Sequence, residues 1–131
     1  MKQDMELIRE ILLHVKERKD TTPKVVTIKG YDEADVVRHV EMLLVEARLL
    51  KGKISLPTRG SSLPYIVIGD LSWEGHDFID VLKNETVWNQ MKAKFRDQLA
   101  ELPLPLLKEA GMAMLKSWVN GKLGLPSDLN E

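Results

Sequence analysis

Residues 32–50 read D-E-A-D-V-V-R-H-V-E-M-L-L-V-E-A-R-L-L, and the fold follows from this stretch. Its apolar side chains recur every three or four residues, in a row made of Val36, Val40, Leu43, Ala47 and Leu50. This spacing predicts a helix that is buried along one side. Asp32 is the expected N-cap, and Glu33 and Asp35 put negative charge in the first turn, where the helix dipole stabilises it.

The residues after this helix predict a β-hairpin. Gly52 marks a turn, and residues 54–56 and 65–68 are short apolar runs expected to pair as strands. Residues 57–64 (P-T-R-G-S-S-L-P) form the connecting loop, and its two prolines limit edge pairing. Helix, strand, loop and strand in this order predict a winged helix with the loop as its wing. The predicted class is α+β and helix-rich, with a small antiparallel sheet.

Helical patterns flank this centre on both sides. A first helix is expected from the cap Asp4 to about Lys19, and residues 25–28 (V-V-T-I) are expected to form a strand. Ser72 and Asn84 are expected N-caps of two further helices, and residues 105–119 predict a last one. We therefore predict a winged-helix domain over residues 1–83. Residues 84–131 would be a C-terminal helical extension, either part of the same domain or a dimerisation arm.

Composition narrows the class of protein. The chain has 131 residues, a net charge of −1 and no cysteine, which excludes disulfides and thiolate chemistry. No apolar run is long enough to span a membrane, and the first residues do not resemble a secretory signal. We therefore expect a cytoplasmic protein. Five acids and one arginine lie in residues 32–47, whereas residues 48–59 carry four cations and no acid.

Several segments resemble a known family. They are K-Q-D-M-E-L-I-R at residues 2–9, Y-D-E-A-D-V-V-R-H-V-E-M-L-L-V-E-A-R-L-L at residues 31–50, and L-S-W-E-G-H-D-F-I-D at residues 71–80, followed by T-V-W. These are similar to a "domain of unknown function" group of bacteria and their prophages, of winged-helix type. That resemblance implies a fold and no catalytic residue.

A broader resemblance is to winged-helix regulators. Residues 36–50 are similar to their recognition helix, and residues 71–76 to the segment that leaves the wing and starts a C-terminal helix. About a dozen residues separate the first and central helices, so the usual second helix is missing or reduced to a turn. In a helix-turn-helix protein that helix crosses the DNA backbone.

The resemblance implies a set of DNA-contacting residues, namely Val37, Arg38, Arg48, Lys51, Lys53 and Arg59. Arg38 can read guanine or hold a phosphate, and the cations near the wing can hold phosphates along a groove. Two alternative explanations of these residues involve no DNA. The central helix can present an ordinary solvated face, and lysines also protect the edge of a sheet.

No catalytic constellation or cofactor motif stands out, and we expect no enzyme and no cofactor. His76 and Asp80 have the spacing of two metal ligands, but a third ligand is not evident, so we expect no metal site. His39 is expected to have a structural role. Trp73 is expected to cover the edge of the core, and Gly75 to allow another backbone close to the helix.

Two functions follow. The first is a small DNA-binding regulator of bacterial or phage origin that contacts double-stranded DNA. The alternative is a winged-helix module that binds another protein and has no DNA affinity. Apolar residues in the C-terminal helices exceed what a small winged helix needs, and they predict a homodimer through those helices.

Overall fold

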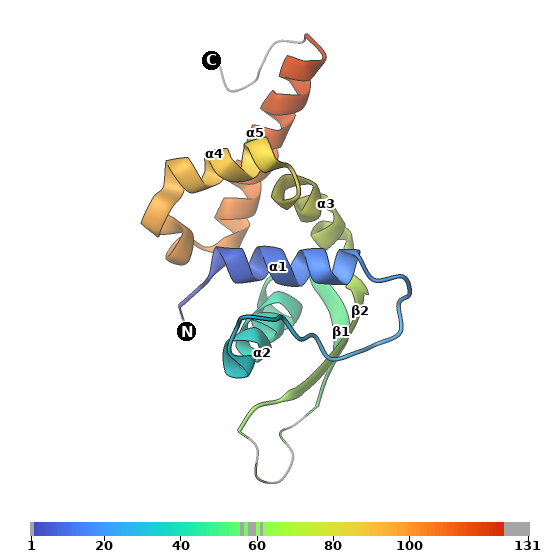
Figure 1. The fold of residues 1–131 in the computed structure, drawn as a ribbon. Coiled ribbons are helices and arrows are strands. Elements are labelled where there is room, and N and C mark those ends of the chain that lie inside the picture. Colours follow the sequence, from blue (N-terminus) through green and yellow to red (C-terminus); the bar gives the residue numbers. More distant parts are fainter. Residues whose placement is uncertain (1, 56, 58–59, 61, 125–131) are drawn as a thin grey trace.

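The computed structural model describes residues 2–55, 57, 60 and 62–124. Its elements (Figure 1) are the helices α1 (Met5–Lys16), α2 (Glu33–Glu41), α3 (Trp73–Leu82), α4 (Glu85–Phe95) and α5 (Leu104–Lys122), a π turn η1 (Met42–Glu46), a 3₁₀ turn η2 (Arg96–Ala100), and the strands β1 (Leu50–Ser55) and β2 (Tyr65–Leu71). The α+β, helix-rich class with a small antiparallel sheet and a C-terminal helical extension is confirmed. The order of helix and hairpin is consistent with a winged-helix layout.

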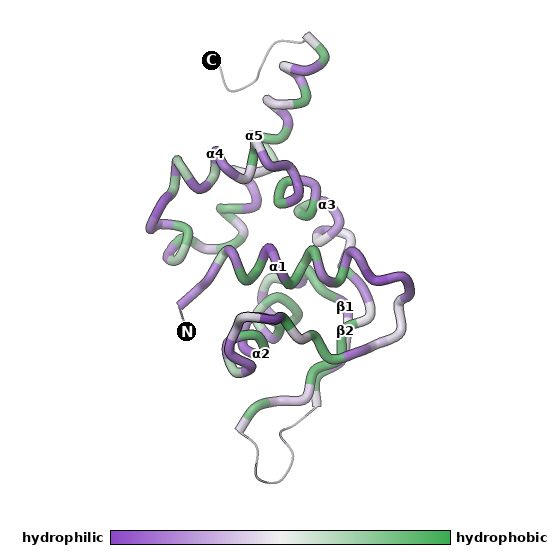
Figure 2. The backbone as a smooth tube through the Cα atoms, in the orientation of Figure 1, coloured by the Kyte–Doolittle hydropathy of each residue, from purple (hydrophilic) through white to green (hydrophobic). Residues whose placement is uncertain are grey.

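Helix α1 lies across the middle of the molecule, with α2 and the hairpin on one side and α3 to α5 on the other (Figure 1). Its apolar face is buried and polar residues line its other side (Figure 2). Arg9 links α1 to the side formed by α3, α4 and α5. Its guanidinium donates to the Leu82 carbonyl over 2.8 Å and also lies over the Trp88 ring. Gln3 donates to the carbonyls of Leu99 and Leu102.

Asp4 caps α1 as predicted, accepting from the Leu7 N–H, but the helix ends at Lys16 rather than near Lys19. The predicted strand at residues 25–28 is wrong, because only Lys24 pairs with β2, at Ile68. Beyond that bridge the chain leaves the sheet to reach α2, with Gly30 in the left-handed region at φ 90°. Residues 17–32 contain no helix, as the sequence indicated.

The central helix is shorter than predicted. α2 ends at Glu41, the π turn η1 follows, and Leu50 already belongs to β1. The cause is tertiary: Arg48 adopts φ 55° and its carbonyl accepts from the Ser72 hydroxyl, while the Leu49 carbonyl accepts from the Ser72 N–H. Asp32 occupies the N-cap position, but its side chain makes no capping hydrogen bond.

The hairpin forms as predicted, with β1 starting earlier. β1 and β2 are antiparallel, and Lys53 pairs with Val67 and Ile54 with Ile66. Gly52 lies within β1 and not in a turn; its partner is Ile68 while Lys51 pairs with Asp70, so Gly69 is a bulge. Because side chains alternate along a strand, Leu50, Gly52 and Ile54 share the inner face, and Lys51 and Lys53 the outer face.

Helices α3 and α4 begin at the predicted caps Ser72 and Asn84. α5 packs on both, and its Gly111 lies so close that an added Cβ would meet Val81 Cγ1 at 2.7 Å. The second half of α5 extends beyond the rest of the molecule (Figure 1). One buried apolar cluster includes residues from both sides of residue 83, and the division into two parts stays a prediction.

Candidate functional site

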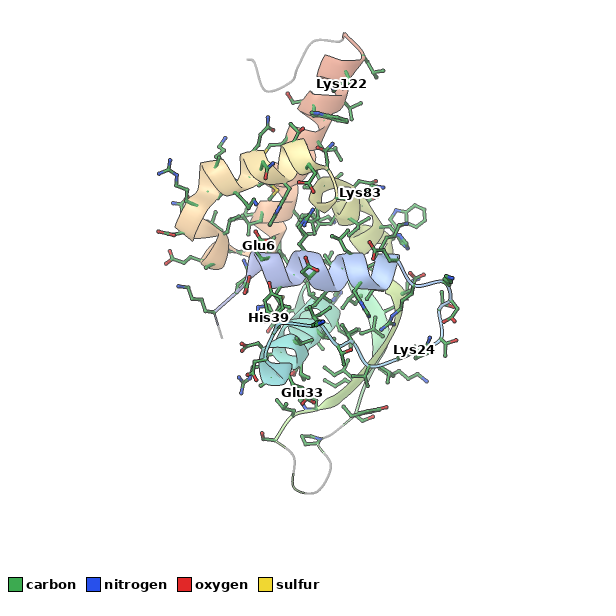
Figure 3. All side chains as sticks on the ribbon, viewed as in Figure 1. Glu6, Lys24, Glu33, His39, Lys83 and Lys122 are labelled. Atoms are coloured by element: carbon green, nitrogen blue, oxygen red, sulfur yellow. The ribbon has the colours of Figure 1, made fainter. Side chains whose placement is uncertain are left out.

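The predicted DNA-contacting residues lie on different faces of the structure. Val37 points toward the hairpin: it is half-buried and lines a groove of about 230 Å³ with Val25, Leu63 and Tyr65. Glu33 stands in the same groove, and Figure 3 places it at the end of α2 next to the hairpin. The groove is mostly apolar, so it suits an apolar side chain better than a phosphate.

Arg38 is exposed and belongs to another surface. It lines a groove of about 980 Å³ between α2, the start of α1 and η2. Five carboxylates and three cations surround that groove, namely Asp4, Glu6, Asp35, Asp97 and Glu101 against Lys2, Arg38 and Arg96. None of the other predicted contact residues lines it. The structure therefore does not join Arg38 and the hairpin cations in one surface among the residues it describes.

The hairpin cations stand on the outer face of the sheet. Lys51 and Lys53 are exposed, Lys51 pairs across the strands with Asp70, and Lys53 lies beside Val67. Arg48 is exposed at the turn just before β1. Arg59 lies outside the described residues. Three of the four cations predicted near the wing thus lie on β1 or just before it.

The solvent side of α2 and η1 is acidic. Asp32, Glu33, Asp35 and Glu46 are exposed and Glu41 is half-buried, with Arg38 as the one cation of this segment. Carboxylates along a helix repel a phosphate backbone, and nothing in residues 32–47 outweighs them. Val45 is also exposed on η1, so apolar surface interrupts the acidic side chains.

His39 has a structural role, as predicted, and its surroundings fix its tautomer. The ring is 2% exposed and lies between α2 and the start of α1 (Figure 3). Nε2 lies 3.0 Å from the Asp4 backbone N–H, which can only donate, so Nε2 accepts. Nδ1 then carries the proton and donates to the Asp35 carbonyl over 2.7 Å. His39 therefore joins the acidic helix to α1 as a neutral ring.

No three histidine or acidic side chains among the described residues are placed to hold one metal ion. His76 Nε2 lies 3.6 Å from Asp70 Oδ1. Asp80, the other residue of the predicted pair, instead pairs with Lys83 at 3.2 Å.

The expected role of Trp73 is wrong, because its side chain is 79% exposed instead of covering the core. The expected close approach at Gly75 is confirmed: an added Cβ would lie 2.1 Å from the Leu49 carbonyl oxygen.

Sequence reasoning missed the acidic groove beside α2. Asp97 in η2 and Glu101 just after it line this groove, although they lie more than fifty positions further along the chain than Asp35. The spacing of residues along the chain cannot predict that these acids line one groove, because their proximity depends on how the C-terminal helices fold back on α1. The Gln3 hydrogen bonds to Leu99 and Leu102 hold that contact in place.

Comparison with known proteins gives a family. The profile of the family described as "Hypothetical protein (DUF2513)" matches residues 2–100, which is most of the chain. The chain belongs to the DUF2513 family. An "Uncharacterized protein" of Haemophilus influenzae is 27% identical over 117 residues, covering 88% of this chain and 96% of that protein. No solved structure matches the chain.

In the described residues, no helix combines the length and apolarity that a membrane crossing requires. The DUF2513 match ends at residue 100, and α5 begins at Leu104. The residues of the acidic groove lie in the matched part, except for Glu101.

Proposed function

We propose that the chain is a non-enzymatic, winged-helix-type module of bacterial or phage origin that acts in the cytoplasm by binding another protein. One observation carries this proposal: the helix in the position of a recognition helix exposes carboxylates with a single arginine among them. Such a face suits a partner surface that carries lysine or arginine. Complementary charges speed the encounter of two proteins and select the partner.

Two further features support a protein partner. Residues 17–32 contain no helix, so the element that crosses the DNA backbone in helix-turn-helix proteins has no counterpart there. Trp73 and Tyr65 are large and exposed, and such side chains are enriched where proteins bind one another.

The test is purification of the tagged full-length chain from its host after nuclease treatment. We expect a protein partner in stoichiometric amount. Charge reversal of α2 (Glu33→Lys, Asp35→Lys, Glu41→Lys) should release it, whereas a matched reversal elsewhere (Glu10→Lys, Glu17→Lys, Asp77→Lys) should not. Recovery of nucleic acid alone, or a partner that ignores the α2 charges, would refute the proposal.

Duplex DNA is the second candidate, and the exposed Lys51 and Lys53 on the outer face of β1 favour it. On this hypothesis those lysines, with Arg48, hold phosphates. Affinity should then fall steeply with salt, and Lys51→Glu with Lys53→Glu should weaken binding to every sequence. The control is Lys19→Glu with Lys94→Glu, which makes the same change in net charge on exposed residues away from the hairpin.

A further inference from the structure

The π turn η1, which continues α2, carries an exposed apolar side chain. Its backbone hydrogen bond runs from the Ala47 N–H to the Met42 carbonyl, five residues back. Such turns are rare in helices and occur frequently at functional sites. Val45 of this turn is 52% exposed and takes no part in the buried apolar cluster of the fold. The packing of the described residues therefore makes little use of this valine.

Val45 borders a shallow groove of about 400 Å³ on the solvent side of α2 and η1. The residues that line the groove recur at helical spacing and are Arg38, Glu41, Met42, Val45 and Glu46. Met42 is half-buried, so it packs on the core with one side and lines the groove with the other. A methionine side chain is flexible and adapts to the shape that packs on it. The lining residues extend over about two helical turns, a length that a second helix can follow.

The charges around this groove select a basic partner. Glu41 and Glu46 stand beside its apolar centre, and neither forms an ion pair with another residue that the structure describes. Asp80 and Glu85, by contrast, each pair with a cation of their own chain. Arg38 at one end of the groove is also without an ion pair in the described part of the chain. A partner that brings cations to the two glutamates and a carboxylate to Arg38 complements all three charges.

We propose that this groove binds a basic amphipathic helix of the partner protein. An apolar side chain of that helix packs on Met42 and Val45. Lysines or arginines about one turn away from it meet Glu41 and Glu46, and an acidic residue meets Arg38. An apolar contact surrounded by charged pairs has the form of a binding hot spot with its rim. The proposal rests on the function proposed above, because it names the segment of the partner that α2 recognises.

The probe is a synthetic alanine-rich helix of about twenty residues, with one central leucine and lysines three and four residues to either side. NMR follows its binding to the full chain labelled with ¹³C at the methionine methyls. The Met42 methyl should shift and saturate, whereas the Met112 methyl on α5 should not move. A peptide with serine in place of leucine should bind about tenfold more weakly, and one with glutamates in place of the lysines should leave Met42 unshifted. A Met42 methyl that shows no saturable shift at about 1 mM of the leucine–lysine peptide overturns the proposal.

Val45→Asp separates apolar contact from charge attraction. The variant adds a negative charge beside the glutamates, so binding by charge alone would become tighter. Because the apolar contact is lost, we expect the leucine–lysine peptide to bind about tenfold more weakly. Val119→Asp makes the same change of charge at an exposed valine of α5 and should leave binding unchanged. Equal or tighter binding by Val45→Asp overturns the proposal.

Purification from the host distinguishes this proposal from the function on which it rests. The expected result is that both charge reversal of α2 and Val45→Asp release the partner. If charge reversal releases the partner but Val45→Asp retains it, the proposed function stands and the groove proposal fails. If no protein partner is recovered, or charge reversal does not release it, both fail together.

Discussion

Among single residues, His39 shows how one side chain ties the acidic helix to the rest of the fold. Its ring accepts from the Asp4 N–H and donates to the Asp35 carbonyl, and it is almost fully buried. Replacement by leucine keeps the volume but leaves the half-buried hydrogen bond from the Asp4 N–H without an acceptor. We expect His39→Leu to lower the free energy of unfolding by about 2 kcal/mol, measured by urea denaturation.

The tautomer of His39 gives a direct check on this contact. Long-range ¹H–¹⁵N correlation should show Nδ1 protonated and Nε2 unprotonated at neutral pH. An Nε2–H tautomer would contradict the hydrogen bond from Asp4. Gln is a useful comparison at this position, because His39→Gln can still accept at one end and should lose less stability than His39→Leu.

His14 makes stability depend on pH. Burial lowers the pKa of His14 below the ordinary 6.5, Arg18 lowers it further, and Glu17 opposes them. The unfolded chain therefore binds the proton more tightly than the folded chain, so stability should fall as the pH drops below about 6.5. We compare the unfolding free energies of the wild type and of His14→Gln from pH 7.5 to pH 5. The value for the wild type minus that for the variant should decrease as the pH falls, because only the wild type carries this histidine.

At the scale of elements, the junction between η1, β1 and α3 determines where the hairpin lies. The backbones of Leu49 and Gly75 are in contact, and Ser72 bonds to both Arg48 and Leu49. Every helix that the sequence predicted is present, and both strands of the hairpin pair. The end of α2 was not predicted, because the row of apolar residues at helical spacing continues to Leu50. In the structure Leu50 belongs to β1 instead. A buried apolar residue fits either element, and only the contact with Ser72 decides between them.

The strand predicted at residues 25–28 failed for a related reason. Its β-branched residues favour extended structure, but the chain must leave the sheet after Lys24 to reach α2. The prediction for Trp73 failed in a similar way. Hydrophobicity alone predicts that a tryptophan is buried, but the tertiary structure leaves this one exposed. Three of the predicted caps, Asp4, Ser72 and Asn84, bond within three residues of themselves, so local sequence predicts them. Asp32 occupies its predicted cap position without a capping hydrogen bond.

The glycine at the junction is the element-scale prediction. An added Cβ at Gly75 would lie 2.1 Å from the Leu49 carbonyl oxygen, so α3 or β1 must shift. We expect Gly75→Ala to cost about 3 kcal/mol of unfolding free energy in thermal or urea denaturation. Gly121→Ala is the matched control, because no atom lies within 4 Å of its Cβ, and it should instead stabilise α5 by about 0.5 kcal/mol. Equal effects of the two changes would contradict the packing described for this junction.

For the whole molecule, the distribution of charge is what favours a protein partner over DNA in our proposal. Lys51 and Lys53 lie on β1, but Arg38 faces a groove with more acids than cations. The sequence showed the acids of α2, because they lie within one helix. It could not show that Asp97 and Asp35 line one groove, since that depends on how the chain around η2 folds back to the start of α1. The family adds no known activity, so the charges carry the argument for function.

The central claim is that the acidic face of α2 keeps the chain off DNA. The most direct measurement is fluorescence anisotropy of a labelled duplex at low salt, with the wild type and with the neutralised chain Glu33→Gln, Asp35→Asn, Glu41→Gln. We predict no saturation by the wild type up to about 100 µM, and measurable, salt-sensitive binding by the neutralised chain. Saturation by the wild type at low micromolar concentration, unchanged by neutralisation and lost with Lys51→Glu and Lys53→Glu, would contradict the claim.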